Sequence, residues 1–361
     1  MRGSDKRSRK RMEKRRGRSS QGVTIREVAA RAGVSPMTVS RVINNENNVT
    51  PATSAAVMAA IQELKYTPNP AARRLAGSET FRIGLLYSNP SVAFLSEFLL
   101  GALDESSKTG HQLVVEKCGA TAATEKAALQ KLLQSGVDGV VLPPPLCEAK
   151  SILAEIAKSG VAAVAVAAGQ PGPDVATVRI DNYKAAHRMT QHLLSLGHRT
   201  IGFIKGHPNQ TVSDQRLHGF LDALSEAGLD PAAAPVEQGY FNYRSGLAAA
   251  DKLLALKDRP TAIFAANDDM AAAVLATAHR LGLNVPVDLS IAGFDDTLIA
   301  GTIWPALTTV RQPIAAMGRA AVSMLLDEVK RRRGGGTSAP AQQLLRHTLV
   351  ERESTAAPSG K

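Results

Sequence analysis

Four residues near the ends of short apolar segments have the chemistry to bind a polar small molecule. Asp295 ends the segment LSIAGFDD, and Asn267 follows TAIFAA. A carboxylate accepts hydrogen bonds from two hydroxyl groups, whereas a carboxamide both donates and accepts. Arg216, near the start of a predicted helix, can form a bidentate contact, and Phe241 offers an apolar face for a ring. Together these residue types suit a hydroxyl-rich ligand.

The elements that must position these residues alternate along the chain from Phe81 onward. The predicted strands are RIGLLYS, HQLVVEKC, VDGVVLPP, VAAVAVAA and TVRID, followed in a second run by RTIGFIKG, APVEQGYF, TAIFAAND and LSIAGFDD. Each strand is short, and each link is long enough for a crossover helix, which predicts parallel sheets covered on both faces. Two such runs predict two Rossmann-like lobes. Ligands of such sheets lie beyond the carboxyl ends of the strands, so the cleft between the lobes is the expected site.

Residues for catalysis or metal binding form no recognisable pattern in the sequence. The eight histidines are scattered, and His187 and His192 are five residues apart, off a common helical face. No HExxH, GxSxG or Walker sequence occurs, and no GxGxxG follows a predicted strand. The acidic pairs in FDD and NDD are adjacent on extended chain, where side chains point to opposite faces. We therefore expect no enzyme activity, no metal site and no cofactor, and we interpret RRRGGGTS at 331–338 as a surface loop.

The net charge of +11 is concentrated in the N-terminal part of the chain. Residues 1–77 hold 16 Lys/Arg against 5 Asp/Glu, and the remaining residues hold 27 of each sign. This distribution is typical of a protein that binds a polyanion through one end. Residues 1–22 are expected to form a disordered basic arm that adds only non-specific, salt-sensitive affinity.

Composition also predicts a cytoplasmic location. The sequence contains no run of about 18 or more apolar residues, and no apolar stretch follows the basic N-terminus. The two cysteines, Cys118 and Cys147, are far apart and in no CxxC pattern, which fits a reducing compartment.

Three short helices are predicted within residues 24–64. A capping box, TIRE at 24–27, opens the first helix, which ends at the glycine of RAGVS. Ser35 caps the second helix with Pro36 at its first position, and the third begins at Thr50-Pro51. Two helices joined by a tight glycine turn, with a third packed behind them, indicate a helix-turn-helix.

The residue string itself points to a family. The sequence TIREVAARAGVSPMTVSRVINNENNVTPATSAAVMAAIQELKYTPNPAARRLAG closely resembles the DNA-binding end of the LacI (lactose-repressor) family, above all in VAARAGVS..TVSRVIN and Y.PN..ARRLAG. The likeness extends from about Thr24 to Arg352. It implies an N-terminal all-α helix-turn-helix domain followed by an α/β core of two lobes. That core has parallel doubly wound sheets and is similar to periplasmic sugar-binding proteins.

The resemblance also implies domain boundaries. The chain is expected to cross between the lobes near Asp181, Val310 and Pro340. The expected parts are a basic arm at 1–22, the helix-turn-helix domain at 23–68, a hinge helix at 69–78, the core at 79–355 and a tail at 356–361. Within the core, lobe 1 is expected at about 79–181 and 311–340, and lobe 2 at about 182–310 and 341–355.

In the family, the helix corresponding to residues 35–44 enters the major groove of operator DNA. Pro36 and Met37 match the positions that select the operator base, and Arg41 matches the recognition arginine, whose fork suits guanine O6 and N7. Because Pro36 and Met37 have no side-chain donors, they must discriminate through shape or apolar contact, for instance with a thymine methyl. The expected phosphate contacts, for which helix capping alone is the alternative at the Ser and Thr positions, are Thr24, Ser35, Thr38, Ser40 and Asn44.

NPAARRLAG at 69–77 resembles the family's hinge helix, which becomes ordered when two copies meet over bent DNA. Asn69 is its predicted cap, and Ala72 is small enough for close helix approach. Leu75 is placed to wedge between base steps in the minor groove, while Arg73 and its neighbouring arginine can hold phosphates. A helix this short is unstable alone in water, so operator DNA would decide whether it forms. A plain linker is the alternative.

The positions that match the family's effector contacts are Phe94, Leu95, Arg216, Phe241, Asn267, Asp295 and Gln312, with weaker support for Asp181. The alternatives are helix capping for Asn267, Asp181 and Asp268, and core packing for Phe241. Purine-binding relatives have Arg and Thr where this chain has Gln210 and Val212. This departure favours a sugar, glucoside or sugar acid over a purine.

The expected function is therefore a DNA-binding repressor of carbohydrate-utilisation genes, controlled by a small effector. A palindromic operator mirrors a twofold axis, so we expect a homodimer, and the terminal STAAPSGK lacks the apolar repeat of a tetramerising tail. The alternatives are a sugar-binding transport component or sensor without DNA function, and a metabolic enzyme of doubly wound fold. Whether the effector releases the operator or strengthens its binding is left open by the sequence.

Overall fold

The computed structural model describes residues 23–43, 49–64, 66, 80–119, 121–170, 172, 174–336 and 339–359. The chain divides into two units, residues 1–80 and 81–361, which we describe separately. Several sequence predictions concern residues outside the described parts, namely the basic arm at 1–22, Asn44, and the hinge segment with Asn69, Ala72, Arg73 and Leu75.

The N-terminal unit contains three helices around a small apolar core. They are α2 (Ile25–Ala32), α3 (Pro36–Ile43) and α4 (Pro51–Glu63). Val28, Val39 and Val57, one from each helix, are fully buried against one another. The predicted arrangement of three helices is confirmed.

Capping groups fix the ends of these helices. The Thr24 hydroxyl accepts from the Glu27 N–H at 3.4 Å, and the Glu27 carboxylate accepts from the Thr24 N–H at 2.7 Å, which completes the predicted capping box. Gly33 follows α2 with φ +67°, a left-handed conformation that glycine adopts without strain. The tight turn between α2 and α3 depends on this glycine.

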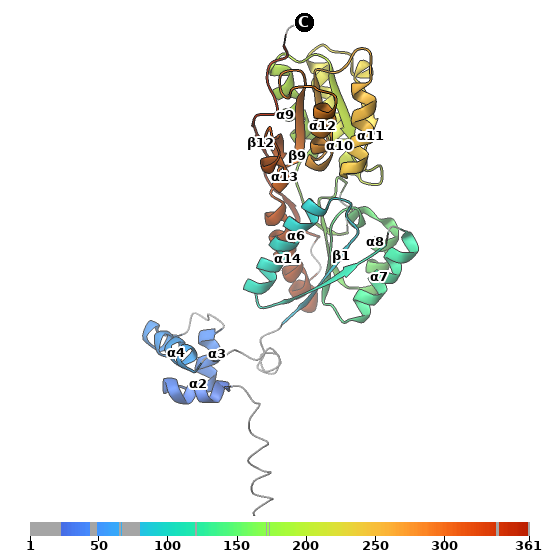
Figure 1. Ribbon diagram of the computed structural model, residues 1–361. Coiled ribbons are helices and arrows are strands. Elements are labelled where there is room, and N and C mark those ends of the chain that lie inside the picture. Colours follow the sequence, from blue (N-terminus) through green and yellow to red (C-terminus); the bar gives the residue numbers. More distant parts are fainter. Residues whose placement is uncertain are drawn as a thin grey trace, which may run out of the picture. The chain divides into compact units, whose positions relative to one another are not determined.

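The second unit contains two six-stranded sheets, each the centre of one lobe (Figure 1). The first sheet has the order β11-β5-β4-β3-β1-β2, and all its neighbouring strands are parallel. Its strands are β1 (Arg82–Tyr87), β2 (Gln112–Lys117), β3 (Gly139–Leu142), β4 (Ala162–Val166), β5 (Ala176–Arg179) and β11 (Gln342–Leu344).

The second sheet has the order β12-β10-β9-β8-β6-β7, and only its edge strand β12 is antiparallel to its neighbour among the described strands. Its strands are β6 (Ile201–Lys205), β7 (Val236–Gln238), β8 (Ala262–Ala265), β9 (Ser290–Asp295), β10 (Thr308–Arg311) and β12 (Thr348–Val350). The predicted doubly wound α/β core is confirmed.

Helix pairs cover the faces of the first sheet, with α6 and α14 on one face and α7 and α8 on the other (Figure 1). These helices are α6 (Val92–Lys108), α7 (Ala122–Gln134), α8 (Lys150–Ser159) and α14 (Ile314–Arg333). Small residues let α6 and α14 approach closely, because a Cβ added at Gly101 would lie 2.7 Å from the Ala315 carbonyl carbon. A short 3₁₀ turn, η1 (Leu146–Glu148), connects β3 to α8.

In the second lobe, α9 packs against α10 and α11 against α12. Its helices are α9 (Asn182–Ser195), α10 (Thr211–Glu226), η2 (Pro231–Ala233), α11 (Tyr243–Leu254), α12 (Asp268–Arg280) and α13 (Leu298–Thr302). The core contains Phe203, Phe220 and Phe264, whose rings stack or meet edge to face at centroid distances of 4.9 and 5.2 Å.

Three segments cross between the lobes: between β5 and α9, between β10 and α14, and between β11 and β12. The first two lie where they were expected, near Asp181 and Val310. The third lies between Leu344 and Thr348, after the expected position near Pro340, because β11 pairs with β5 in the first sheet. Residues 341–344 therefore belong to lobe 1. A strand of three residues is too short for its sequence pattern to predict which sheet it joins.

None of the helices in the described part of the chain is long and apolar enough to cross a membrane.

Candidate functional site

The first candidate surface is the exposed side of α3. Met37 is 65% exposed, and Ser35, Pro36 and Arg41 are also exposed, while Val39 on the opposite side is fully buried. Thr38 and Ser40 are half-buried. An apolar residue and an arginine thus share one accessible helix surface, as the second helix of a helix-turn-helix requires for contact with base edges.

Two of the predicted phosphate contacts also act as helix caps. The Ser35 hydroxyl accepts from the Thr38 N–H at 3.1 Å and lies 2.9 Å from the Thr38 hydroxyl. Thr24 caps α2 as described above. Thr24 and Ser35 are therefore helix caps, which leaves a phosphate contact possible, and phosphate contact stays a prediction for all five positions.

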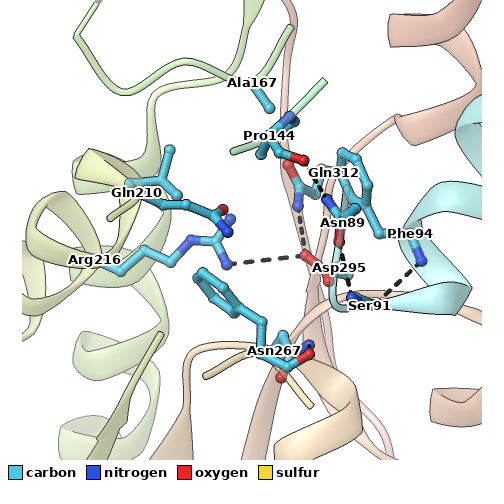
Figure 2. Close-up of a pocket in the computed structure, with 12 residues that line it drawn as sticks. Asn89, Ser91, Phe94, Pro144, Ala167, Gln210, Arg216, Asn267, Asp295 and Gln312 are labelled. Atoms are coloured by element: carbon cyan, nitrogen blue, oxygen red, sulfur yellow. Dashed lines mark hydrogen bonds and ion pairs between the residues drawn. The ribbon is translucent and has the colours of Figure 1, made fainter. Parts of the chain in front are cut away.

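The second candidate site is a cavity between the two lobes of the core. It contains about 360 Å³ of space and opens at the carboxyl ends of strands from both sheets. Figure 2 shows Gln210 and Arg216 entering it from one side and Asn89, Ser91 and Phe94 from the other. Its lining residues are Asn89, Ser91, Phe94, Pro144 and Ala167 of lobe 1, Gln210, Val212, Arg216, Phe241, Asn267 and Asp295 of lobe 2, and Gln312 in a crossing segment.

Most of the residues singled out from the sequence meet here. Phe94, Arg216, Phe241, Asn267, Asp295 and Gln312 all line the cavity. Leu95 and Asp181 do not. Leu95 is half-buried next to Phe94 on α6. Asp181 caps α9, where its carboxylate accepts from the Lys184 N–H at 2.9 Å and pairs with the Lys184 amine at 3.2 Å. The capping alternative therefore describes Asp181.

Sequence reasoning missed much of the first lobe's contribution. Asn89, Pro144 and Ala167 each follow the carboxyl end of a strand, β1, β3 and β4 respectively. The same strand-end rule that selected Asp295 and Asn267 could have found them. Ser91 caps α6, accepting from the Phe94 N–H at 3.3 Å, and its hydroxyl donates to the Asp269 carboxylate of the other lobe at 2.8 Å.

Arg216 and Asp295 form the charged centre of the cavity. The Arg216 Nη1 and Asp295 Oδ1 atoms lie 3.9 Å apart, and both side chains are 6% exposed. The guanidinium also donates to the Asn182 side chain at 2.9 Å and to the Ala266 carbonyl, and it lies 3.6 Å from the centroid of the Phe294 ring. Its orientation is therefore fixed by the second lobe alone.

Burial shifts the proton affinities of this pair. Burial lowers the pKa of Arg216 to about 10, against the opposing charges of Asp295 and Asp268, so the guanidinium remains charged at neutral pH. Burial raises the pKa of Asp295 to about 7, although Arg216 and a hydrogen bond from Gln312 lower it. Asp269 and Glu97 raise it further through their charges.

Asp268 supports the site from behind without lining it. Its carboxylate accepts from the Thr309 hydroxyl at 2.6 Å and from the Thr297 N–H at 2.8 Å, which ties α12 to the segments after β9 and in β10. Burial raises the pKa of Asp268 well above its usual range, and the charge of Asp295 adds to this. The capping alternative is wrong for Asp268, because Asn267 is the N-cap of α12 and the Asp268 carboxylate instead accepts from Thr297 and Thr309.

Asn267 and Phe241 have both a packing and a lining role. Asn267 caps α12 by accepting from the Met270 N–H at 3.1 Å, and its amide donates to the Phe241 carbonyl at 3.1 Å. The Phe241 ring packs directly over Gly206, where an added Cβ would overlap the ring. Capping and packing therefore place these two residues at the cavity and do not compete with a role there.

Backbone strain is concentrated at this cavity. Among the described non-glycine residues, Ala167, Phe241, Asp295 and Asp296 have positive φ, and the first three line the cavity. Asp295 has φ +117°, which L-residues rarely adopt. Such conformations persist where the surrounding structure holds them, and they cluster at functional sites.

Two buried polar atoms at the cavity have no hydrogen-bond partner, Nε2 of Gln210 and Oε1 of Gln312. Leaving buried polar groups unpaired is costly, so they favour a ligand that supplies both an acceptor and a donor. Among the described residues, no cluster of His, Cys, Asp and Glu could hold a metal ion.

Comparisons with known proteins identify the family. Residues 24–69 match the family of bacterial regulatory proteins of the lacI type, and residues 190–355 match a periplasmic binding protein-like domain. The chain is 36% identical over 339 residues to the HTH-type transcriptional repressor PurR of Pectobacterium carotovorum, covering 92% of this chain and 97% of that protein. The chain belongs to the LacI family.

Other members of the LacI family agree with this assignment. Catabolite control protein A of Priestia megaterium is 34% identical over 304 residues, which cover 84% of this chain and 91% of that protein. Among solved structures, a complex of the transcriptional regulator CelR with cellobiose matches with a TM-score of 0.70 at 34% identity, covering 92% of this chain and 99% of that one.

The dimeric lac repressor bound to operator and the anti-inducer ONPF matches with a TM-score of 0.71 at 30% identity, covering 93% of this chain and all of that one. This LacI-family chain is therefore a DNA-binding transcriptional regulator with a periplasmic-binding-protein-like effector domain. The α3 surface and the interlobe cavity are its candidate DNA and effector sites.

Proposed function

We propose that this LacI-family regulator is a homodimeric, cytoplasmic repressor of carbohydrate-utilisation genes, controlled by a sugar or glycoside bound in the interlobe cavity. The observation that carries the effector class is the pair of unpartnered groups, Gln210 Nε2 and Gln312 Oε1. A hydroxyl group both accepts and donates, so a polyhydroxylated ligand satisfies both atoms at once.

Charge favours a neutral effector over a sugar acid. Arg216 is the only cationic residue among those that line the cavity, and it already faces Asp295. An added carboxylate would meet Asp295 in a buried setting, where like charges repel strongly. The Asp295 carboxylate instead suits two hydroxyl donors.

The apolar side chains that line the cavity support the same class. Phe94 and Phe241 provide apolar faces for a sugar ring. The relative CelR, whose structure contains cellobiose, is a precedent for such a ligand. Val212, which has no hydrogen-bonding side-chain group, stands where purine-binding relatives have Thr.

For DNA, we propose that α3 lies in the major groove, with Arg41 reading a guanine and with Pro36 and Met37 selecting bases by apolar contact. Thr24, Ser35, Thr38, Ser40 and Asn44 would contact phosphates. Asn69, Ala72, Arg73 and Leu75 would form the hinge helix in the minor groove. The effector and the operator each favour one arrangement of the lobes, and typical coupling of about 1–3 kcal/mol changes operator affinity roughly 5- to 150-fold.

The test is operator affinity measured with and without candidate effectors. A palindromic duplex selected in vitro from random sequences is titrated with the full chain, alone and with cellobiose, glucose, gluconate or guanine. We expect salt-dependent nanomolar binding that changes at least fivefold with a neutral sugar. The direction of the change distinguishes induction from corepression.

Two results would contradict the proposal. A response to guanine and to no sugar would overturn the effector class. Absence of any selected duplex, together with tight sugar binding, would favour the alternative of a sugar-binding transport component or sensor.

A further inference from the structure

A carboxylate of lobe 1 binds the N-terminus of a helix in lobe 2. Glu148, at the end of η1, accepts from the Thr211 N–H at 2.9 Å and from the Thr211 hydroxyl. Thr211 is the first residue of α10, so the carboxylate lies at the positive end of that helix's dipole. Gln210, the N-cap residue of α10, makes no side-chain capping bond of its own. A residue of the other lobe thus caps this helix.

The same carboxylate also organises the facing loop of its own lobe. Glu148 accepts from the Gly169 N–H at 2.7 Å and from the Gln170 N–H at 3.0 Å. The Gly169 carbonyl in turn accepts from the Gln215 side chain of α10 at 2.6 Å. The loop after β4, η1 and the first turn of α10 are therefore joined in one hydrogen-bonded cluster that spans the two lobes.

Close contact between the lobes at this point requires a glycine. A Cβ added at Gly169 would lie 2.8 Å from the Val212 nitrogen and would also overlap the Thr211 hydroxyl. The backbone of Gly169 does not have the positive φ that excludes other residues, and the three atoms nearest to an added Cβ all belong to the start of α10. Alanine at position 169 would therefore clash with α10 in the closed arrangement.

The three segments in this cluster also line the cavity. Pro144 lies four residues before Glu148, Ala167 lies two residues before Gly169, and Gln210 and Val212 flank Thr211. The cavity walls of the two lobes therefore cannot separate here while the cluster is intact. Because Glu148 caps α10, the Gln210 side chain is not needed as a cap and its unpartnered Nε2 lies at the cavity.

We propose that Glu148 and Gly169 form a latch that holds the lobes closed and so sets effector affinity, although neither residue lines the cavity. They are positioning residues. The predicted effect on effector affinity rests on the proposed function, in which an effector binds in this cavity. A ligand that contacts both lobes binds the closed state. Apparent affinity falls in proportion to the closed fraction, so opening the latch would weaken effector binding without altering any lining side chain.

Lobe closure can be measured without any ligand. Lys158 on α8 and Ser225 on α10 are exposed and belong to different lobes, whereas the native Cys118 and Cys147 are buried. Spin labels are attached at Lys158→Cys and Ser225→Cys in the full-length protein, which is diluted with unlabelled chain so that distances within one chain dominate. Pulsed electron paramagnetic resonance then measures the distribution of interlobe distances.

We expect one dominant short distance in the otherwise native protein. Glu148→Gln removes the charge from the cluster, and Gly169→Ala blocks the approach of α10. Each should raise the ratio of open to closed molecules about tenfold, which corresponds to about 1.4 kcal/mol. Asp214→Asn is the matched control, since this carboxylate lies in the same first turn of α10 but pairs with Lys205 of its own lobe at 3.6 Å.

Distributions of both variants identical to that of Asp214→Asn would overturn the latch, as would a native protein that is already open. Circular dichroism checks that each variant is folded. If one is not, Gln215→Ala, which removes the donor to the Gly169 carbonyl, provides the same comparison. No sugar is present in this experiment, so a failed latch and a failed sugar proposal are distinguishable.

Discussion

Arg216 Nη1 lies 3.9 Å from Asp295 Oδ1 at the centre of the interlobe cavity, with both side chains 6% exposed. The two residues are 79 positions apart in sequence, and the lobe-2 fold places both side chains at the same cavity. The pair is oriented before a ligand arrives, since Asn182, Ala266 and Gln312 hold its polar atoms. Because these polar groups are already oriented, little conformational entropy is lost when a ligand binds to them.

The raised pKa of Asp295 predicts a pH dependence of stability. Its native pKa is about 7, compared with about 3.9 in an unfolded chain, so between these values the native state binds the proton more strongly. The free energy of unfolding should therefore fall as pH rises from about 4 to about 7, and this contribution should level off above pH 7. Arg216, with a pKa of about 10, stays charged across this window.

Asp295→Asn keeps the shape of the side chain but cannot titrate, so it should flatten that slope. Urea unfolding at a series of pH values, compared between the wild type and the variant, measures the difference. Equal slopes for both proteins would show that Asp295 titrates near its ordinary pKa.

Gly206 is predicted to control the position of the Phe241 ring. Gly206→Ala places a methyl group where the ring now lies, so the ring must move and the apolar face of the cavity is lost. We expect affinity for a sugar that alters operator binding to fall about tenfold or more, with all polar lining residues unchanged. Isothermal titration calorimetry measures the affinity. Gly301→Ala is the control, because an added Cβ there meets nothing within 4 Å. Equal losses of affinity in both variants would contradict a role of the Phe241 ring in sugar binding.

Arg41 is predicted to read one operator base. Arg41→Lys preserves the charge but removes the planar fork, so discrimination at one base pair should fall by about 1–3 kcal/mol while non-specific binding is unchanged. Binding to the selected duplex and to single-base variants measures this. Arg31→Lys, whose guanidinium pairs with Glu63 within the same unit, serves as the control. A uniform loss across all duplexes would instead make Arg41 a phosphate contact.

Leu75 lies outside the described residues, and the prediction for it rests on the sequence. If Leu75 wedges between base steps, Leu75→Ala should weaken binding to the selected duplex about tenfold or more and change binding to random DNA little. Met58→Ala, an exposed apolar position on α4, controls for a general effect of truncation. Fluorescence anisotropy with both duplexes provides the comparison, and equal losses would make the segment a plain linker.

The amino-acid sequence alone was enough to predict the family, the alternation of strands and helices, and the caps of the N-terminal helices. These features are local, because a TxxE capping box, a glycine after a helix and the periodic spacing of apolar residues each depend on a few consecutive residues. The strand-end rule also selected Asp295 and Asn267, because in a parallel sheet the carboxyl ends of strands meet at one edge. Applied to lobe 1, the same rule would have reached Asn89 and Pro144.

Features that depend on contacts between distant segments could not be predicted from the sequence and became visible in the folded chain. Asp181 caps α9 and does not line the cavity. Strand β11 pairs with β5 in the first sheet, and the sequence of a three-residue strand does not show which strand it pairs with. The burial that raises the pKa of Asp295 and the positive φ of Phe241 arise from packing around them. The contact of Glu148 with Thr211, 63 residues away, exists only because the two lobes meet, and no local pattern specifies where two surfaces touch.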